Sequence, residues 1–418
     1  MSRPTLSLVP PLRIDFDVRA LASAARALLV SDEQEARAQA ERVAPDALAF
    51  LSVRSALCAY LEAQLQSGRW HRGDEVLVSA LTITDMPRIL EAYGMRVVPL
   101  DVDPQTLAPR IADVRRHITP RTRALLVAHL FGARAELEPF ARLCRERGLA
   151  LLEDCAQAFA GPGWWGHPAA ELSMFSFGTL KTRTSLGGAL VIVRDAELRA
   201  RMTQVQARWP AQARGAFTKK VAKSALFLLA QHPVVYGALA LLVAAAGKAL
   251  GDVLRMATRG FPAKDTAELL SLLRLRPCAP LLRFLARRVS APSSRRADAR
   301  LTARAALGER ALEAARALGV AIGAAAHNRT HWAFAVRASD PQRLRAALAE
   351  AGVDASGASN ISAVGGIHAP PALRALVEEL VFLPVYPEVA AARRRAIEAV
   401  LARELARPTP ELRAPLAA

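Results

Sequence analysis

The chain has 418 residues, of which 52% are hydrophobic and 22% are charged. This balance is typical of a globular protein with a large core and excludes a disordered chain, and the length favours more than one domain. The formal net charge of +18 favours anionic partners such as phosphorylated small molecules, acidic lipids or nucleic acid. A composition rich in Ala and Arg produces the same positive surface without any such partner.

The four cysteines and the first residues of the chain indicate a reducing compartment. Cys58, Cys144, Cys155 and Cys278 are widely spread and form no CxxC pair, so we expect neither a disulfide framework nor a metal site. The first twenty residues contain no continuous apolar run followed by a small-residue cleavage site, which predicts a cytoplasmic protein.

From about residue 45 to 195, short apolar runs alternate with amphipathic helical patterns. Five of the runs are typical of buried strands, at residues 74–80, 96–102, 123–130, 149–154 and 189–193. Repeated strand–helix–strand patterns predict an α/β fold, in which helices cover both faces of a mostly parallel sheet. We assign this large domain to residues 1–265.

Residues 205–265 form an unusual part of that domain. A basic helical stretch leads into an apolar run from 225 to 246, which Pro233 interrupts. The uninterrupted part is shorter than the ~20 residues that span a bilayer as one helix. Lysines on both sides suit an element that lies on anionic lipid through residues 225–250. A buried helical hairpin or a dimer contact explains the same pattern equally well.

The remainder of the chain predicts a smaller C-terminal α+β domain over residues 266–405. It is rich in helical patterns and Arg, with a strand expected within 331–338, a helix at 341–351 and a basic final helix that ends near residue 405. Residues 406–418 are expected to be a flexible tail.

Two segments carry candidate chemistry. EDCAQA (153–158) ends one expected buried strand, and SFGTLK (176–181) follows another short apolar run. Ligands of open α/β sheets bind beyond the carboxyl ends of the strands, where both segments fall. Pyridoxal phosphate (PLP) needs a lysine, an acid for its ring nitrogen and a hydroxyl for its phosphate, which Lys181, Asp154 and Ser176 could supply. Gln157 is spaced to reach the same cavity.

Several motifs resemble those of the DegT/StrS group of PLP-dependent sugar aminotransferases. The segment from GDEVLVSA to LDVDPQTL (73–107) is similar to that group, as is TPRTRALLVAHLFG (119–132). EDCAQAFAG resembles the group's EDAAQAHGA, FSFGTLK resembles FSFxxxK, and LPVYP (383–387) resembles LPLHP. The likeness is close over 73–195 and loose elsewhere.

The resemblance implies a PLP fold-type I protein with assigned roles for four residues. Lys181 would hold the cofactor and move the proton between the substrate carbon and the cofactor carbon. Asp154 would keep the ring nitrogen protonated, Gln157 would bond the ring hydroxyl, and Ser176 would bind the phosphate.

Four further positions follow from the same resemblance, with departures. Arg54 and Ser55 match an early phosphate loop, but SVRSAL (52–57) lacks the group's glycine, so Arg54 would supply a direct charge instead. Ile83 stands where the group carries an aromatic residue that stacks on the ring. His129 matches a histidine near the active site, and a satisfied core histidine is an equal alternative.

The resemblance therefore predicts a homodimeric aminotransferase. It would move an amino group from glutamate to a nucleotide- or lipid-linked keto-sugar in cell-envelope polysaccharide or secondary-metabolite biosynthesis. The reaction would take place in the cytoplasm or at the inner face of the membrane. Lysine at position 181 favours transamination over the dehydratases of the group, which have histidine there. The alternative is a catalytically altered protein that acts as a scaffold in such a pathway. No nucleic-acid-binding signature accompanies the positive charge, so we expect no nucleic-acid partner.

Overall fold

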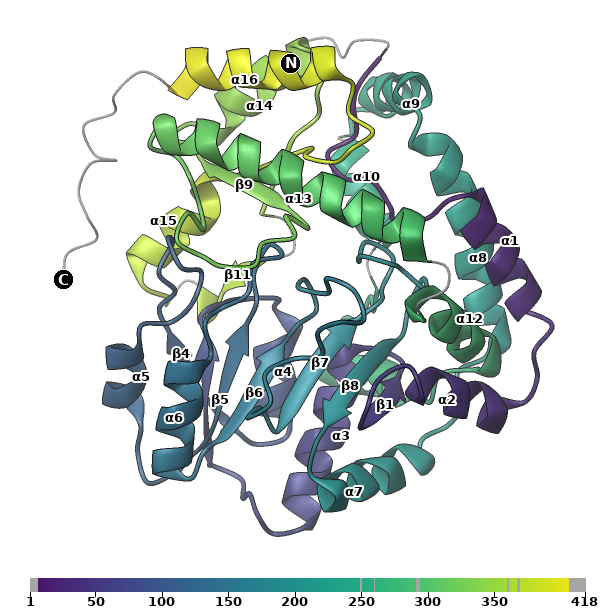
Figure 1. Ribbon diagram of the computed structural model, residues 1–418, viewed down its shortest axis with the longest axis vertical. Helices are drawn as coiled ribbons and strands as arrows, with labels where there is room; N and C mark the ends of the chain where they lie inside the picture. Colours follow the sequence, from purple (N-terminus) through teal and green to yellow (C-terminus); the bar gives the residue numbers. More distant parts are fainter. Residues whose placement is uncertain are drawn as a thin grey trace.

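A computed structural model describes residues 7–248, 250–258, 260–290, 294–358, 361–366 and 369–405. The expected tail at 406–418 lies outside these residues. Figure 1 shows a large sheet in the lower part of the molecule and a smaller, helix-covered sheet above it.

The large sheet is mostly parallel, as the sequence predicts. Its strands, in spatial order, are β1 (Ala47–Phe50), β8 (Ala189–Val193), β7 (Leu172–Ser176), β6 (Ala150–Asp154), β5 (Thr122–Ala128), β2 (Glu75–Ser79) and β4 (Arg96–Leu100). All neighbours run parallel except β8, which is antiparallel to both β1 and β7. The five expected strands are confirmed within a few residues at each end.

Helices cover both faces of this sheet, because its central strands bury side chains on both sides. One face packs against α3 (Val53–Gln66), α4 (Asp85–Ala92), α7 (Ala196–Ala207) and α11 (Thr266–Leu273). The other packs against α2 (Glu33–Glu41), α5 (Ile111–His117), α6 (Glu138–Arg147) and α12 (Ala279–Val289). Adjacent strand residues divide between the faces: Val76 and Val78 lie in the first core, and Leu77 lies in the second.

The smaller sheet is antiparallel and has the order β10 (Ser356–Gly357), β12 (Leu380–Leu383) and β9 (Phe334–Arg337). Three helices share a core with its outer face: α13 (Ser294–Ala317), α14 (Pro341–Glu350) and α16 (Ala391–Leu405). Its inner face and α15 (Pro371–Glu379) pack on loops of the large sheet. A short ladder between β3 (Leu81–Thr82) and β11 (Ser362–Ala363) also joins the two parts.

The packing with the large sheet continues beyond residue 265, where the sequence placed the boundary. Both α11 and α12 lie on the large sheet, and the helices of the smaller sheet begin with α13. The apolar composition of α11 and α12 does not reveal which sheet they cover, so their packing on the large sheet could only come from the structure.

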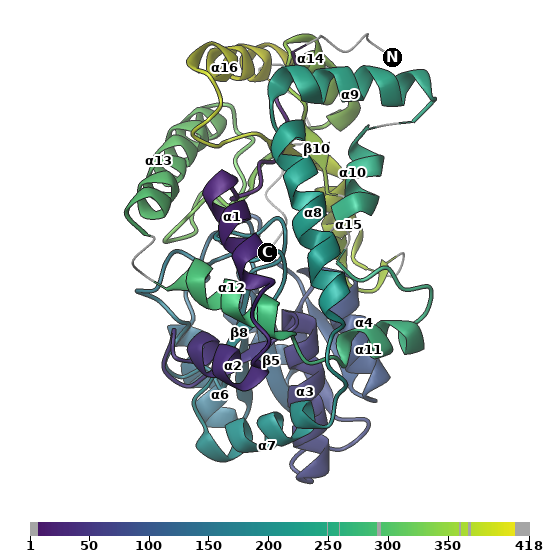
Figure 2. The same ribbon diagram turned by 90° about the vertical axis from the view of Figure 1, so that its right-hand side faces the viewer.

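The 205–265 segment folds into three further helices, α8 (Arg214–Ala230), α9 (Pro233–Ala245) and α10 (Leu250–Thr258). Figure 2 shows α8 running beside α1 (Val18–Ala27) and α12, with α9 turned across the top of the molecule. Each of α8 and α9 buries one side and exposes apolar residues on the other, so the buried-hairpin prediction holds for one side only. By length and composition, no single helix of the described chain could cross a bilayer. The pair α8 and α9 meets the same criteria when the two helices are taken together, but they are bent by 101° relative to each other.

Candidate active site

The structure brings Asp154, Ser176 and Lys181 to one edge of the large sheet. Asp154 ends β6 and Ser176 ends β7, and these two strands pair in parallel, so their carboxyl ends lie at the same edge. Lys181 lies in the turn that follows β7, where its backbone N–H donates to Gly178 O at 2.9 Å. The charges of Lys181 and Asp154 interact. The two sequence segments predicted to carry chemistry therefore meet in space.

The environment of Lys181 favours a neutral amine. Burial lowers the pKa of Lys181 to about 8; Asp154 works against this shift and the positive charge of Arg54 adds to it. No carboxylate within the described chain forms an ion pair with Lys181. Its Nζ instead lies 4.1 Å from the ring centroid of Trp332. An amine with this pKa is partly deprotonated at neutral pH and can act as a nucleophile or base.

Asp154 is a partly buried acid with room for another partner. Burial raises its pKa, while a hydrogen bond from Ala156 N (3.0 Å) and the charge of Lys181 lower it. That hydrogen bond to Oδ1 is the one found at this carboxylate among the described residues. A protonated ring nitrogen would compensate the buried charge.

Gln157 and Ser176 are both held by backbone contacts. Gln157 Oε1 accepts a hydrogen bond from Phe131 N at 2.7 Å, which fixes its amide beside the loop after β5. Ser176 Oγ accepts a longer one, 3.4 Å, from Gly178 N, so its hydroxyl keeps its own proton for donation.

The start of α3 carries Arg54 and Ser55. Ser52 caps this helix by accepting from Ser55 N at 3.1 Å, and the two serine hydroxyls lie 2.9 Å apart. Ser55 is fully buried, so its hydroxyl serves the helix cap. Arg54 forms an ion pair with Asp85, and its guanidinium lies 4.6 Å from the Phe261 ring centroid. Arg54 is therefore the residue of this pair that adds charge to the site.

His129 and Ile83 occupy apolar surroundings. His129 is 2% exposed; its Nδ1 accepts from Ala135 N at 3.0 Å, and its Nε2 lies 3.2 Å from Glu153 Oε1. The Glu153 side chain points to the face of β6 opposite to that of Asp154, which favours the core-histidine alternative. His129, Glu153 and Cys155 also bring potential metal ligands within 4.8 Å of one another, but both histidine nitrogens already have partners. Ile83 is partly buried against the core under α3.

Two contributors from the smaller domain were not predicted. Trp332 covers Lys181 and donates from Nε1 to Leu180 O at 2.8 Å. Arg304 on α13 is 7% exposed and donates to Thr182 Oγ1 (3.1 Å) and Thr330 O (3.0 Å). Both lie far from residues 153–181 in the sequence and meet them only through tertiary packing, so no local motif marks them.

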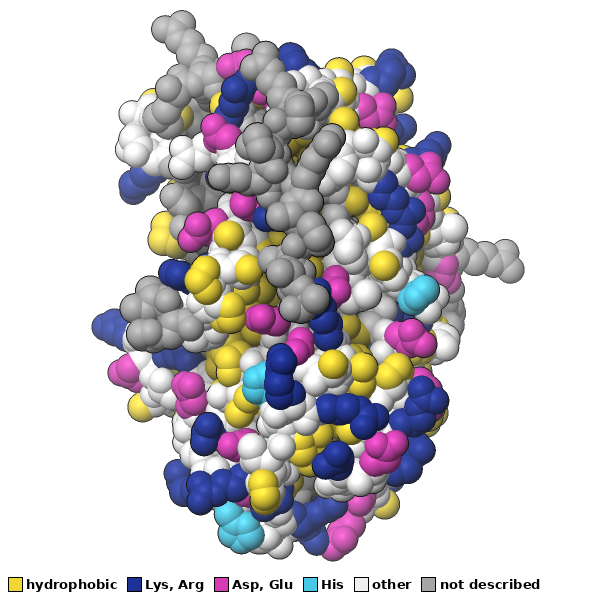
Figure 3. Space-filling model, turned by 90° about the vertical axis from the view of Figure 1, so that its left-hand side faces the viewer, with side chains coloured by type: hydrophobic (Ala, Val, Ile, Leu, Met, Phe, Trp, Pro, Cys, Tyr) yellow, Lys and Arg dark blue, Asp and Glu magenta, His cyan; other side chains and the backbone are white. Residues whose placement is uncertain are grey.

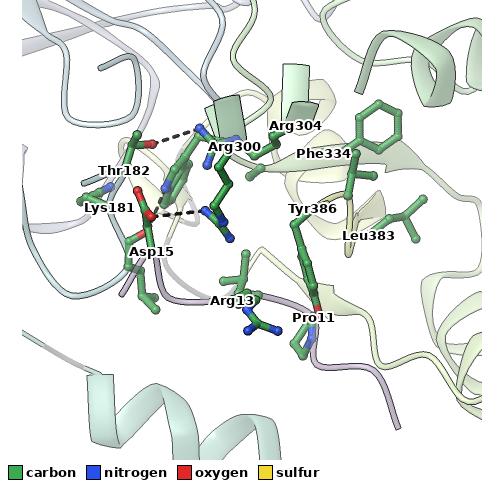
Figure 4. A pocket seen from close by; sticks show the side chains of 15 residues that line it. Pro11, Arg13, Asp15, Lys181, Thr182, Arg300, Arg304, Phe334, Leu383 and Tyr386 are labelled. Carbon is green, nitrogen blue, oxygen red and sulfur yellow. Dashed lines mark hydrogen bonds and ion pairs between the residues drawn. The ribbon is translucent and has the colours of Figure 1, made fainter. Parts of the chain in front are cut away.

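A cavity connects these residues with the N-terminal segment. Figure 4 shows Lys181, Thr182, Arg300 and Arg304 on one side of it and Arg13 with Tyr386 on the other. Arg300 is paired with Asp15 at 3.4 Å and with Glu388 at 2.7 Å. Arg304 contacts no carboxylate among the residues that the structure describes, and burial lowers its pKa to about 10. Arg304 therefore brings to the cavity a positive charge that no direct ion pair neutralises among the described residues.

The residues at this edge fit pyridoxal phosphate. The group requires an amine that can lose its proton, an acid facing a ring nitrogen and a hydroxyl donor for the phosphate. Lys181 has the lowered pKa, Asp154 has unused acceptor capacity in a partly buried position, and the Ser176 hydroxyl keeps its proton for donation. These three observations agree with the cofactor that the sequence motifs imply.

Comparisons with known proteins support this assignment. Residues 32–223 match the DegT/DnrJ/EryC1/StrS aminotransferase family. The dTDP-4-dehydro-2,3,6-trideoxy-D-glucose 4-aminotransferase of Saccharopolyspora spinosa is 34% identical over 158 residues, which cover 37% of this chain and 40% of that enzyme. The match thus spans less than half of the relative's length.

Two solved structures share the fold over nearly the whole chain. DesV of S. venezuelae has a TM-score of 0.64 at 20% identity, covering 94% of this chain and 95% of DesV. NtdA of Bacillus subtilis, solved with bound cofactor PMP, has a TM-score of 0.64 at 14% identity, covering 97% of this chain and 87% of NtdA. Residues 32–223, which carry Asp154, Ser176 and Lys181, are thus similar to the DegT/DnrJ/EryC1/StrS aminotransferase family, and the fold of the chain is shared with solved aminotransferases.

Proposed function

We propose that this protein is a PLP-dependent aminotransferase that transfers an amino group from glutamate to a keto-sugar. The observation that carries the proposal is the placement of Lys181, with its lowered pKa, at the same carboxyl edge of the sheet as the partly buried Asp154, whose charge acts on it. The family match over residues 32–223 and the names of the relatives support the sugar class of the acceptor.

The side chains at the site have different roles in the proposed reaction. Bound PLP supplies an electron sink for the carbon that gains or loses a proton. Lys181 Nζ takes and returns that proton, which its pKa near neutrality permits. Asp154 holds the positive charge of a ring nitrogen, and Ser176 donates to phosphate. Trp332 covers the lysine from the smaller domain and limits its contact with water.

The cavity below α13 supports a substrate with an anionic portion. Arg304 has no acid partner in the described part of the chain, and a buried cation without one is costly. The phosphates of a nucleotide- or lipid-linked sugar would compensate that charge. The pathway proposed is therefore cell-envelope polysaccharide or secondary-metabolite biosynthesis.

The scaffold alternative has less support. It was motivated by the altered loop at 52–57 and by Ile83 in place of a stacking aromatic residue. Lys181, Asp154 and Ser176 nevertheless meet in one site, and the relatives are enzymes.

The remaining parts of the proposal concern partners and location. A homodimer rests on the sequence resemblance alone. A cytoplasmic protein that contacts the inner face of the membrane through residues 225–250 is supported by exposed apolar residues on α8 and α9, among them Leu226, Leu229 and Leu242. Figure 3 shows that Lys and Arg on one face are interspersed with acidic and apolar side chains, which does not favour a nucleic-acid surface.

The test is spectroscopic. Purified protein incubated with PLP should show an absorbance band near the visible edge, which glutamate abolishes and a keto acid restores. Borohydride treatment should then label Lys181, as peptide mass mapping would detect. In Lys181→Ala the label and the glutamate response should both be lost. A colourless wild-type protein, or a label elsewhere, would contradict the proposal.

A further inference from the structure

Lys220 places a positive charge from the 205–265 segment against the site. It lies on α8, between the buried residues Phe217 and Val221, which pack with Leu281 in one core. A Cβ atom placed on Gly187 would lie 3.1 Å from Lys220 Nζ, so the ammonium group sits directly against the backbone of this glycine. The side chain is partly buried.

The backbone at Gly187 and Gly188 contacts both segments that are expected to bind phosphate, the end of β7 and the start of α3. The Gly187 N–H donates to Phe177 O at 3.2 Å, and Phe177 directly follows Ser176. The next residue, Gly188, donates to Leu51 O at 3.0 Å, and Leu51 directly precedes the Ser52 cap of α3. The ammonium group of Lys220 therefore lies over the backbone that joins the Ser176 end of β7 to the first turn of α3.

Among the residues that the structure describes, no carboxylate pairs with the ammonium group of Lys220. Within the same residues, the side chain of Lys220 forms no hydrogen bond or ion pair, whereas its backbone oxygen accepts from Ser224 Oγ. Two ionisable groups act on it: Cys278, whose own pKa is raised by burial, and Arg54. A thiol with a raised pKa stays protonated at neutral pH, and Arg54 repels Lys220, so burial lowers the pKa of Lys220 and its charge stays uncompensated.

The first turn of α3 adds to the same positive field. The N-terminus of a helix carries about half a positive charge and unpaired backbone N–H groups. The Ser52 hydroxyl accepts a hydrogen bond from Ser55 N. The N–H groups that precede Ser55 in this turn are therefore left for another acceptor. Arg54, already paired with Asp85, lies on this turn. The charges of Lys220 and Arg54 interact, and the hydrogen bond from Gly188 to Leu51 links the loop beside Lys220 to the residue that precedes the α3 cap.

We propose that Lys220 binds the phosphate of the cofactor, so that the 205–265 segment completes the phosphate site from within the same chain. This inference rests on the proposed PLP function and extends it to a residue outside the known motifs. The phosphate dianion supplies the counter-charge that Lys220 lacks. The segment then has a role in cofactor retention in addition to its packing role.

The experiment compares cofactor affinities of the full-length protein. Wild type, Lys220→Gln and Lys220→Arg are titrated with PLP and, separately, with pyridoxal, which lacks the phosphate; absorbance and quenching of tryptophan fluorescence report binding. We expect Lys220→Gln to raise the Kd for PLP at least tenfold and to leave the Kd for pyridoxal unchanged. Lys220→Arg should restore most of the PLP affinity. Lys219→Gln, an exposed neighbour on the same helix, is the matched control and should bind as wild type does.

The outcomes separate the two proposals. Equal losses of PLP and pyridoxal affinity in Lys220→Gln, or unchanged PLP affinity, would overturn the role of Lys220 while PLP binding itself stands. Inorganic phosphate, followed by broadening of its phosphorus NMR signal, tests the same site without PLP. If wild type bound phosphate but not PLP, the aminotransferase proposal would fail while the anion site survived, and if it bound neither, both would fail. Circular dichroism and Tm values identify a variant that has merely lost its fold.

Discussion

Burial is the largest influence on the titration of Lys181, and two charges of opposite sign modify it. Asp154 favours the charged amine, whereas burial and Arg54 favour the neutral one, and the result is a pKa of about 8. In the cofactor-free protein, modification of Lys181 by an amine-reactive reagent should therefore rise with pH and reach half its maximum near pH 8. An ordinary lysine titrates near 10.4. Peptide mass mapping over a pH series measures the midpoint, and a midpoint above 10 would contradict the geometry.

The two neighbours of Lys181 should move that midpoint in opposite directions. Asp154→Asn removes a negative charge that stabilises the ammonium form, so the midpoint should fall. Arg54→Gln removes a positive charge that destabilises it, so the midpoint should rise. Shifts of the same sign in both variants would mean that solvation changes, rather than charge, control the amine. Exposed Lys219 within the same samples serves as an internal reference.

The sequence predicts the local part of this site but not its tertiary part. Asp154, Ser176 and Lys181 follow buried strands in consecutive segments, and strand ends are readable from apolar runs. Trp332, Arg304 and Lys220 reach the site from a loop, α13 and α8, and their role depends on how distant elements pack. Conversely, Ser55 matched a motif position, yet its hydroxyl contacts Ser52 because a serine before the helix provided a cap.

At the scale of elements, the packing of α13 against the loop before β9 depends on Gly308, a small residue on this helix. A Cβ atom on Gly308 would lie 2.1 Å from Cγ of His331, so only glycine lets this ring pack on the helix. His331 Nε2 lies 2.8 Å from Glu309 Oε1, and Arg329 Nη2 lies 2.8 Å from Glu309 Oε2. Overpacking at such contacts typically costs about 1–3 kcal/mol. Gly308→Ala should therefore lower the free energy of unfolding by that amount, although alanine favours helices.

Denaturant unfolding of three variants tests this packing. Gly215→Ala, on α8, adds a Cβ that meets nothing within 4 Å, so it should be neutral or stabilising by up to about 1 kcal/mol. The double variant Gly308→Ala with His331→Ala should lose less stability than the two single changes combined, because the clash disappears. Additive losses would show that the ring does not contact the helix.

The sequence predicts whether a segment is a strand or a helix better than it predicts the direction of a strand or the sheet on which a helix packs. The apolar runs that became β2, β4, β5, β6 and β8 are long enough to read as strands. That β8 is antiparallel to both neighbours depends on the turn from Ser176 to Gly188, which no periodicity reveals. α12 has an apolar side that suits either sheet, and only its packing on α2 decides between them.

At the scale of the whole molecule, α8 and α9 form a bent pair of helices. One side of the pair is buried, and the other side exposes apolar residues. Phe217 and Val221 face the core, whereas Leu226 and Leu229 are each 65% exposed and Leu242 is 69% exposed. Lys219 is also exposed on α8. Apolar side chains beside basic ones suit insertion among anionic headgroups.

Vesicle sedimentation tests this membrane contact. Wild type should bind vesicles that contain acidic phospholipid more strongly than neutral ones, and added salt should weaken the binding because it screens the charges. The double variant Leu226→Glu with Leu229→Glu loses two side chains, each worth about 1.5–3 kcal/mol when fully buried. Partial insertion of both should still give at least a tenfold loss of binding. Leu29→Glu, which changes another exposed leucine outside α8 and α9, should bind as wild type does. Equal sedimentation of all variants, or no preference of wild type for acidic lipid, would leave the α8–α9 surface without a membrane role.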